Sequence, residues 1–364
     1  MTHFSRLGMN KRKKNTPSYS FSKLLLQWNT HCNTRQMPWK GEKDPYKIWL
    51  SEIILQQTRV EQGLNYYIRF VNAFPDVHKL AKATDEKVFK YWEGLGYYSR
   101  CRNLLAAARY ISKELGGNFP FTYEEIVKLK GVGPYTAAAI ASFAYNLPYA
   151  VVDGNVFRVL ARVYGVETPV DITEGKKRFT VLADELLDKK QPGLYNQAIM
   201  DFGAVVCRPV SPLCDSCPFR QHCVAFKKKL ISSFPVKLKK TAVKKRWFYY
   251  FVLKSEDKIA VQQRVEKDIW QGLYEFPMIE SRKETPIEEI VRQAIKKGWI
   301  KKEALMSLNK IEKYSQQLSH QTVTGFFIKT DALCLPETKW RWITAAERKK
   351  LAFPVLINRF LRAE

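Results

Sequence analysis

Two acidic residues, Glu52 and Asp153, stand in contexts where a carboxyl group could do chemistry. Glu52 is the only charged residue between positions 48 and 55, and on a helix it would share a face with Trp49 and Gln56. Burial of a carboxyl group among apolar side chains favours its neutral form, which a proton donor near neutral pH requires. A solvent-facing glutamate is the alternative interpretation.

Asp153 ends a stretch, residues 131–152, that contains no charged side chain. An aspartate directly before a helix is a common N-cap. This role is compatible with chemistry, because amide hydrogen bonds and the helix dipole keep the acid ionised. An ionised carboxylate can stabilise a sugar cation. A proton-donating acid paired with an anionic one is what cleavage of a glycosidic bond requires.

The uncharged stretch opens with a glycine turn that could hold a phosphate group. Gly131, Val132 and Gly133 precede Pro134 and an alanine run. Glycines two positions apart indicate a tight turn, and proline followed by alanines favours the start of a helix. Free amide N–H groups at the start of a helix bind phosphate. The sequence therefore predicts a backbone-phosphate site a short distance from a carboxylate.

Four cysteines, Cys207, Cys214, Cys217 and Cys223, follow the spacing C-x6-C-x2-C-x5-C. Four thiolates this close in sequence can hold one tetrahedral zinc ion or a four-iron cluster, and the spacing alone does not choose between them.

A second glycine turn, residues 94–100, combines aromatic and basic side chains before a helix. Tyr97 with Arg100 beside it suits wedging between bases of a nucleic acid, and a packed turn is the alternative.

The elements that must position these residues fall into two domains. Helical spacing of apolar residues recurs at 21–31, 44–59, 61–74, 84–91, 99–115, 122–129, 136–145, 154–164, 175–187 and 195–206. Strand-like alternation is nearly absent there, so residues 21–226 are predicted to form an all-α domain. Strand-like aromatic runs at 247–253 and 323–328 flank a helical segment at 287–297, which predicts a separate α+β domain over 247–364. Residues 1–20 are predicted to be a disordered basic arm, and residues 227–246, with eight lysines, one arginine and no acid, a basic linker.

The charge balance favours a polyanionic partner. Lys and Arg number 61 against 35 acids, which gives a net charge of +26. Nucleic acid and an acidic membrane surface are the candidates, and no amphipathic basic helix supports the membrane. No signal peptide is evident, so we expect a cytoplasmic protein in which cysteines serve as ligands rather than in disulfides.

With these segments in view, the chain resembles the helix-hairpin-helix DNA glycosylase superfamily and, within it, the MutY-type adenine DNA glycosylases. Residues 49–58, 94–100, 131–137, 151–155 and the cysteine spacing match the family's motifs in order. The resemblance implies removal of adenine mispaired with 8-oxoguanine or guanine in double-stranded DNA, after the adenine is flipped out of the duplex. It also implies a monomer associated with the nucleoid, and a [4Fe–4S] cluster on the four cysteines in preference to zinc.

The same resemblance assigns roles to individual residues. Glu52 would protonate the flipped adenine and Asp153 would stabilise the sugar cation. Tyr135 and Asn155 would support the resulting intermediate, and Gly131, Val132 and Gly133 would hold a DNA phosphate. The implied substrate-binding residues are Arg35, Leu55, Gln57, Thr58, Tyr97, Ser319 and His320. Among them, Arg35 would lie against the adenine and Tyr97 would act as the wedge.

Two departures from the family pattern refine these expectations. Bifunctional relatives carry a lysine in the hairpin where this chain has Tyr135, so no Schiff base can form there and at most weak strand nicking is expected. The C-terminal domain resembles the family's MutT-like (Nudix-type) module that recognises 8-oxoguanine. Residues 280–298 lack the glutamate spacing of the metal-binding box, which predicts no hydrolase activity. Leu318 replaces a phenylalanine beside Ser319, so stacking by that residue is lost.

Overall fold

The computed structural model describes residues 20–238, 243–305, 311–330 and 340–363. The predicted basic arm, residues 1–20, therefore lies outside the described residues except for Ser20, which caps the first helix. The chain divides into two compact units, one made of residues 1–40 and 146–237 and the other of residues 41–145 and 238–364. The predicted all-α domain is thus shared between the two units, a division that local helical spacing does not reveal.

The first unit is helical in its described part. Its helices are α1 (Phe21–His31), α9 (Gly154–Tyr164), α10 (Thr173–Leu186), α11 (Pro192–Val205) and the short α12 (Val224–Lys227). α11 packs against both α1 and α9. The core is aromatic: Phe21 stacks on Phe219 with ring centroids 4.5 Å apart, and Phe202 meets Trp28 edge-on at 5.0 Å. α11 therefore joins the two sequence segments that make up this unit.

The second unit begins with a group of helices. They are α2 (Pro45–Leu55), α3 (Val60–Ala73), α4 (Val77–Lys82), α5 (Asp85–Trp92), α6 (Tyr98–Glu114), α7 (Tyr123–Ile126) and α8 (Pro134–Tyr145). α2 starts where Asp44 accepts a hydrogen bond from the Tyr46 amide at 2.9 Å, with proline in the first turn. It is apolar on nearly all sides and packs against α3, α6 and α8, as expected for an interior helix.

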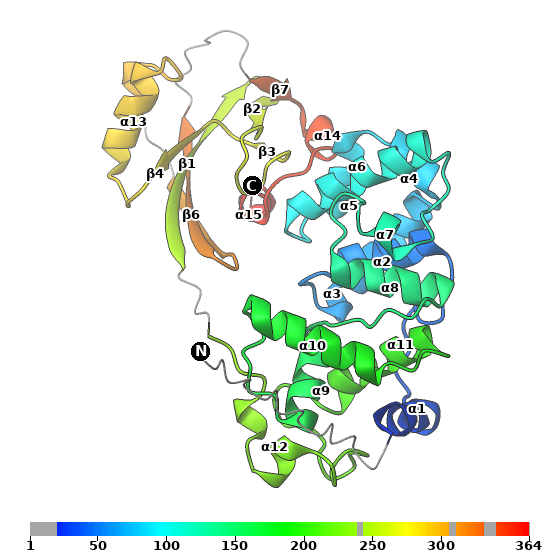
Figure 1. Cartoon of the computed structure of the whole chain (residues 1–364). Coiled ribbons are helices and arrows are strands. Elements are labelled where there is room, and N and C mark those ends of the chain that lie inside the picture. Colours follow the sequence, from blue (N-terminus) through cyan, green and yellow to red (C-terminus); the bar gives the residue numbers. More distant parts are fainter. Residues whose placement is uncertain (1–19, 239–242, 306–310, 331–339, 364) are drawn as a thin grey trace, which may run out of the picture. The chain divides into compact units, whose positions relative to one another are not determined.

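The rest of the second unit is built on a mixed sheet, shown in Figure 1. In the described residues this sheet has seven strands in the order β3-β2-β1-β6-β5, with β4 pairing with β1 and β7 with β2. The strands are β1 (Lys244–Ser255), β2 (Lys258–Gln263), β3 (Tyr274–Glu275), β4 (Met278–Ser281), β5 (Ile311–Gln317), β6 (Gln321–Thr330) and β7 (Arg341–Ile343). β1 and β6 are parallel, whereas the other pairs are antiparallel.

Helices cover both faces of this sheet. α13 (Ile287–Lys296) packs on one face, where Ile290 joins a buried cluster with Phe251 of β1. On the other face Tyr250 stacks on Phe327 at 5.1 Å, and Phe327 stacks on Phe360 of α15 (Val355–Ala363) at 4.3 Å. The short α14 (Ala345–Arg348) precedes α15. Neighbouring residues of β1 thus face opposite helices, as strand alternation requires.

Several predicted boundaries are corrected by the structure. The helix predicted over 44–59 ends at Leu55, because Gln57 adopts a left-handed backbone conformation. α4 was absent from the predicted elements. The predicted basic linker, 227–246, is shorter at both ends, since α12 includes Lys227 and β1 begins at Lys244. Among the described residues no helix has the length and apolar character needed to cross a membrane.

Candidate active site

Asp153 lies immediately before α9 in the first unit and is half-buried. Its Oδ1 accepts hydrogen bonds from the amides of Asn155 at 2.9 Å and Val156 at 2.8 Å, which confirms the predicted N-cap. Its Oδ2 accepts a third from Asn155 Nδ2 at 2.9 Å. Burial raises the pKa of Asp153, and the hydrogen bonds, which lower it, do not cancel this effect. This upward shift of the pKa is opposite to the downward shift that amide donors and a helix dipole alone would produce.

Asn155 is fixed by α9 and α11 together. Arg158 donates to Asn155 Oδ1 at 2.9 Å and to the Gly203 carbonyl at 2.6 Å. Gly203 lets α11 approach Asn155 closely, because a Cβ at position 203 would lie 2.6 Å from the Cβ of Asn155. Asn155 therefore cannot shift without moving α11.

α11 also holds the segment that leads into Asp153. The buried Asn196 side chain accepts from the Val151 amide at 3.2 Å and donates to the Tyr149 carbonyl at 2.8 Å. On the same helix, Asp201 accepts from Arg35 at 2.8 Å. Sequence reasoning did not identify Gly203, Asn196 or Asp201 of α11, because their partners lie far away in the chain.

Glu52 lies on α2 in the second unit and is only 7 % exposed. Its neighbours on the helix, Ile48, Ile53 and Ile54, are buried as well. The interpretation of Glu52 as a buried carboxyl group is confirmed, and the solvent-facing alternative is wrong. Glu52 and Asp153 belong to different units.

Two residues near Glu52 hold left-handed backbone conformations that non-glycine residues seldom adopt. Gln57 has φ 55° in the turn after α2, and Tyr97 has φ 47° in the turn before α6. Such conformations are unfavourable and persist only where the surroundings enforce them, often at functional sites. Gln57 is exposed and Tyr97 is 40 % exposed, so both can reach a ligand, while Leu55 and Thr58 are half-buried.

The buried Arg100 holds these two turns together. Its Nη1 donates to the carbonyls of Ile53, Ile54 and Gln56 at 2.6–2.9 Å, and its Nη2 donates to the Gly96 carbonyl at 3.3 Å. Arg100 is thus a structural clamp, which supports the packed-turn interpretation for this side chain. The sequence gives little signal for this role, because Arg100 lies between Ser99 and Arg102 in a mixed turn that fits surface exposure as well.

The predicted phosphate turn has the expected shape in the second unit. Gly131 has φ 83°, and a Cβ there would lie 2.6 Å from Asn103, so glycine is required. Gly133 does not need glycine for its own backbone, and open space surrounds its Cα. Proline then begins α8, which places the amides of Val132 and Gly133 just before a helix. Tyr135 is half-buried in the first turn of α8.

Ser319 and His320 are exposed at the tip of the β5–β6 hairpin. Within the second unit, Ser319 Oγ is hydrogen-bonded to the hydroxyl of Tyr97. Tyr97, Ser319 and His320 line a cavity of about 470 Å³, together with the other residues of segments 94–99, 268–270 and 316–321. The structure thus brings together two residues that the sequence places 222 positions apart.

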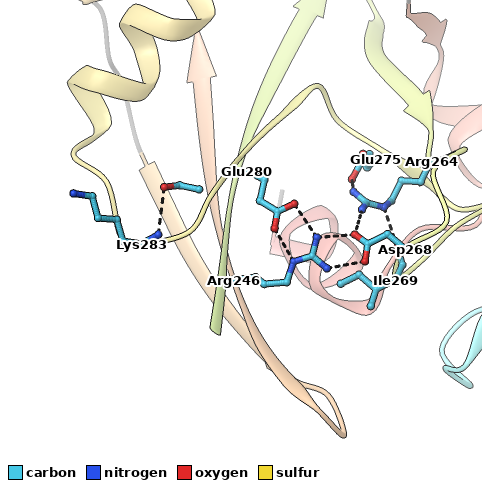
Figure 2. Close-up of polar contacts among 8 residues, drawn as sticks. Arg246, Arg264, Asp268, Ile269, Glu275, Glu280 and Lys283 are labelled. Atoms are coloured by element: carbon cyan, nitrogen blue, oxygen red, sulfur yellow. Dashed lines mark hydrogen bonds and ion pairs between the residues drawn. The ribbon is translucent and has the colours of Figure 1, made fainter. Parts of the chain in front are cut away.

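An ion-pair network, drawn in Figure 2, includes Asp268, which lines this cavity. Arg246 binds Asp268 through two hydrogen bonds of 2.8 and 2.6 Å and Glu280 through two of 2.7 and 2.8 Å. Arg264 bridges Asp268 at 3.0 Å and Glu275 at 2.6 Å. Burial would raise the pKa of Asp268, but hydrogen bonds and the nearby guanidinium charges lower it overall. These acids therefore neutralise arginines.

The four cysteines line one small cavity in the first unit. All four are half-buried free thiols, and Arg162 of α9 donates to Cys207 Sγ at 3.5 Å and to the Arg208 carbonyl at 2.8 Å. Burial raises the pKa of Cys217 to about 12 and that of Cys223 as well. In the described part of the chain, no three His, Cys, Asp or Glu side chains are grouped so as to hold a metal ion.

Comparisons with known proteins match both parts of the chain. Residues 50–180 match the model of the HhH-GPD superfamily of base excision DNA repair proteins, and residues 249–363 match the NUDIX domain. The predicted fold class, a helical glycosylase domain followed by a Nudix-like domain, is thereby confirmed.

Relatives with assigned activities cover much of the chain. An adenine DNA glycosylase of Buchnera aphidicola (subsp. Schizaphis graminum) is 33% identical over 309 residues, which are 84% of this chain and 86% of that protein. The adenine DNA glycosylase of Homo sapiens is 42% identical over 215 residues, 57% of this chain and 39% of that protein. Among solved structures, a thermostable thymine-DNA glycosylase gives a TM-score of 0.53 at 30% identity, covering 57% of this chain and 95% of its own.

Proposed function

Since this chain belongs to the adenine DNA glycosylase family, we propose that it excises adenine lying opposite 8-oxoguanine or guanine in duplex DNA. The observation that supports this most is the presence of two carboxyl groups in different surroundings: Glu52 is buried on α2 beside buried isoleucines, and Asp153 accepts hydrogen bonds from neutral donors before α9. Acid-assisted cleavage of an N-glycosidic bond needs one acid as proton donor and one as anion.

In the proposed mechanism the adenine is first flipped out of the duplex, because its glycosidic bond cannot be reached in the stack. Glu52 gives its proton to the flipped base, and the electron pair of the C–N bond leaves with the protonated adenine. Asp153 stabilises the positive charge that develops on the sugar, directly or through a transient covalent bond. Water then adds to the sugar carbon and releases a proton to solvent, from which Glu52 is reprotonated, and the products are an abasic site and free adenine.

Asn155 and Tyr135 support this step. Asn155 holds Asp153 Oδ2 and is itself held by Arg158, so the carboxylate keeps one orientation. Tyr135 stands where a bifunctional enzyme would carry a lysine, and a phenol cannot form a Schiff base with the sugar. We therefore expect base removal with at most weak strand cleavage.

Contacts with DNA are proposed for two regions of the second unit. The amides of Gly131 and Gly133 before α8 suit a backbone phosphate, aided by the net charge of +26. Val132 lies between them and donates its own amide to the Leu129 carbonyl at 3.0 Å. The exposed turn residues Gln57 and Tyr97, with Thr58, suit the base opposite the adenine, and Tyr97 has the size of a wedge.

The cavity beside Tyr97 is the proposed recognition site for 8-oxoguanine. Ser319 and His320 place hydroxyl and imidazole groups at its edge, where they can bond to the polar edge of an oxidised purine. Leu318 offers no aromatic ring, so we expect hydrogen bonding rather than stacking to supply discrimination. Leu55 and Arg35 are assigned to the adenine side.

We expect a [4Fe–4S] cluster on Cys207, Cys214, Cys217 and Cys223. One cavity lined by four half-buried thiols and bordered by Arg162 fits such a group. Zinc on the same four sulfurs, each about 2.3 Å from the ion, is the alternative, and the resemblance to the family favours the cluster. The cluster would brace the cysteine loop against α9. The protein is expected to act as a monomer on the cytoplasmic nucleoid.

The test is incubation of the protein with a labelled duplex that holds one adenine opposite 8-oxoguanine, followed by a denaturing gel with and without alkali. Cutting of the adenine strand only after alkali supports the proposal. Cutting without alkali would indicate a bifunctional enzyme, and an intact strand under both conditions would refute adenine excision. A duplex with thymine in place of that adenine is the matched control.

A further inference from the structure

We infer that Asp201 is a positioning residue that holds Arg35 at a fixed position relative to Asp153. The inference rests on the proposed function, because it takes Arg35 to lie against the adenine. It adds a residue of α11 that touches neither the base nor the sugar and acts through Arg35.

Asp201 is a fully buried carboxylate, 0 % exposed, at the C-terminal half of α11. Its Oδ1 accepts from Arg35 Nη1 at 2.8 Å, and its Oδ2 lies 3.1 Å from the Lys40 ammonium. Gln197 and Asn33 donate to the two oxygens at 3.1 and 2.9 Å. A buried charge persists only where paired and hydrogen-bonded, and Asp201 has both kinds of partner.

Three of these four partners, Arg35, Asn33 and Lys40, come from one loop, the segment between α1 and α2, and Gln197 lies on α11 itself. Asn33 also accepts from the Arg35 amide at 3.1 Å, and Lys40 donates to the Arg35 carbonyl at 2.9 Å. Arg35 is therefore fixed through its backbone on both sides and through its side chain by one carboxylate. In the described part of the chain, the ion pair with Asp201 is the one polar contact of the Arg35 guanidinium, which leaves its other N–H groups for a ligand.

α11 links this loop to the acid that carries the proposed chemistry. Asn196 of α11 holds residues 149–151, and Gly203 of α11 packs against Asn155. Arg35 and Asp153 are thus both positioned by contacts with the same helix, α11, and these contacts lie entirely within the first unit. A displaced Arg35 would misplace the base relative to Asp153, and an error of about 1 Å in such a geometry can lower a rate about 100-fold.

The test is a double-mutant cycle on single-turnover adenine excision with Asp201→Asn, Arg35→Ala and the double variant. We expect each single variant to lower the excision rate about 10- to 100-fold, with binding of an uncleaved duplex weakened less than about threefold. The double variant should be no slower than the slower single variant, since Asp201 acts through Arg35. Additive losses, or full excision by Asp201→Asn, would overturn the inference.

Asp201→Glu covers the case in which Asp201→Asn does not fold. It keeps the negative charge buried but moves the carboxylate by one methylene, so it should show the same loss and the same lack of additivity with Arg35→Ala. Excision at the wild-type rate by Asp201→Glu would equally overturn the inference. Glu185→Gln, an exposed acid on α10, is the matched control and should keep the wild-type rate. A wild-type protein that leaves the adenine strand intact would refute the proposed function itself, and the inference with it.

Discussion

Asp153 in the first unit and Asp268 in the Nudix-like part of the second unit are both aspartates with several hydrogen-bond donors. Their donors differ in charge. The hydrogen bonds to Asp153 come from amide N–H groups, at 2.8–2.9 Å; the nearby charge of Arg158 lowers its pKa, but burial raises the pKa overall. Asp268 is held by two arginines at 2.6–3.0 Å (Figure 2), and its pKa is lowered.

The difference separates an acid kept for chemistry from an acid kept for structure. A carboxylate already neutralised by two guanidinium groups has little field left for a developing cation, whereas one held by neutral donors keeps its negative charge directed at a ligand. Because the pKa of Asp153 is raised in the fold, its ionisation near neutral pH should lower the free energy of unfolding. Ionisation of Asp268, whose pKa is lowered, should raise the free energy of unfolding.

The largest effect is expected from Glu52→Gln, which removes the proposed proton donor but keeps the shape of the side chain. General acid catalysis typically contributes about 10²- to 10⁴-fold, so the single-turnover excision rate should fall by that factor. The melting temperature should change little, because glutamine keeps the size of the side chain and is neutral like the protonated acid. Excision at the wild-type rate by Glu52→Gln would show that Glu52 is not the proton donor and would contradict the proposed pair of acids.

Gly203→Ala sharpens the comparison by moving the surroundings of Asp153 without changing any charge. The new methyl group would meet Asn155 at 2.6 Å, so α9 and α11 must separate. We expect about 1–3 kcal/mol of lost stability and a rate loss of about 10-fold or more, measured by melting and single-turnover excision. Gly154→Ala, at a helical glycine with open space around it, is the control. Equal behaviour of the two variants would contradict the role of this contact.

Asp268→Asn tests the structural half of the comparison. Its carboxylate is 32 % exposed, so loss of the charged hydrogen bonds should cost about 1–2 kcal/mol at neutral pH. Because the folded pKa of Asp268 is lowered, its contribution is present above the unfolded pKa, about 3.9, and is lost as pH falls through the folded pKa. The stability gap between wild type and Asp268→Asn should thus close below about pH 4 in urea unfolding. A gap that is constant with pH would refute the ion-pair explanation.

The smallest effect is expected from Ser319→Ala. Loss of one neutral hydrogen bond is worth about 0.5–1.5 kcal/mol, which corresponds to a preference for 8-oxoguanine over guanine that falls about 2- to 10-fold. The measurement is the ratio of excision rates on duplexes with adenine opposite either base. Ser315→Ala on the neighbouring strand is the control. An unchanged ratio would remove Ser319 from the recognition site.

Local sequence signals were sufficient for most of the longer helices and for several isolated sites. Apolar spacing gave the first helix to the residue, and the N-cap role of Asp153 and the burial of Glu52 are confirmed. The glycine turn before α8 was found because backbone conformation depends on the residue itself, as at Gly131.

Sites formed by long-range pairing were beyond the reach of spacing rules. Asp201 meets Arg35 across 166 positions, and the sequence around Asp201 reads as an ordinary helix. Arg100 was left between a contact with nucleic acid and a place in a packed turn, because its partners, the carbonyl groups of Ile53 and Ile54 at the end of α2, lie 46–47 positions away in the chain. Division of the helical segment between two units likewise depends on contacts that no local pattern encodes.

The most direct measurement is the single-turnover excision rate and melting temperature of Asp153→Asn at neutral pH. Asparagine caps a helix as well as aspartate does, so we predict a melting temperature equal to or above that of the wild type. The excision rate should fall by at least about 100-fold, because the anion is gone. Excision at the wild-type rate, or a marked loss of stability like that expected for Asp268→Asn, would contradict the account.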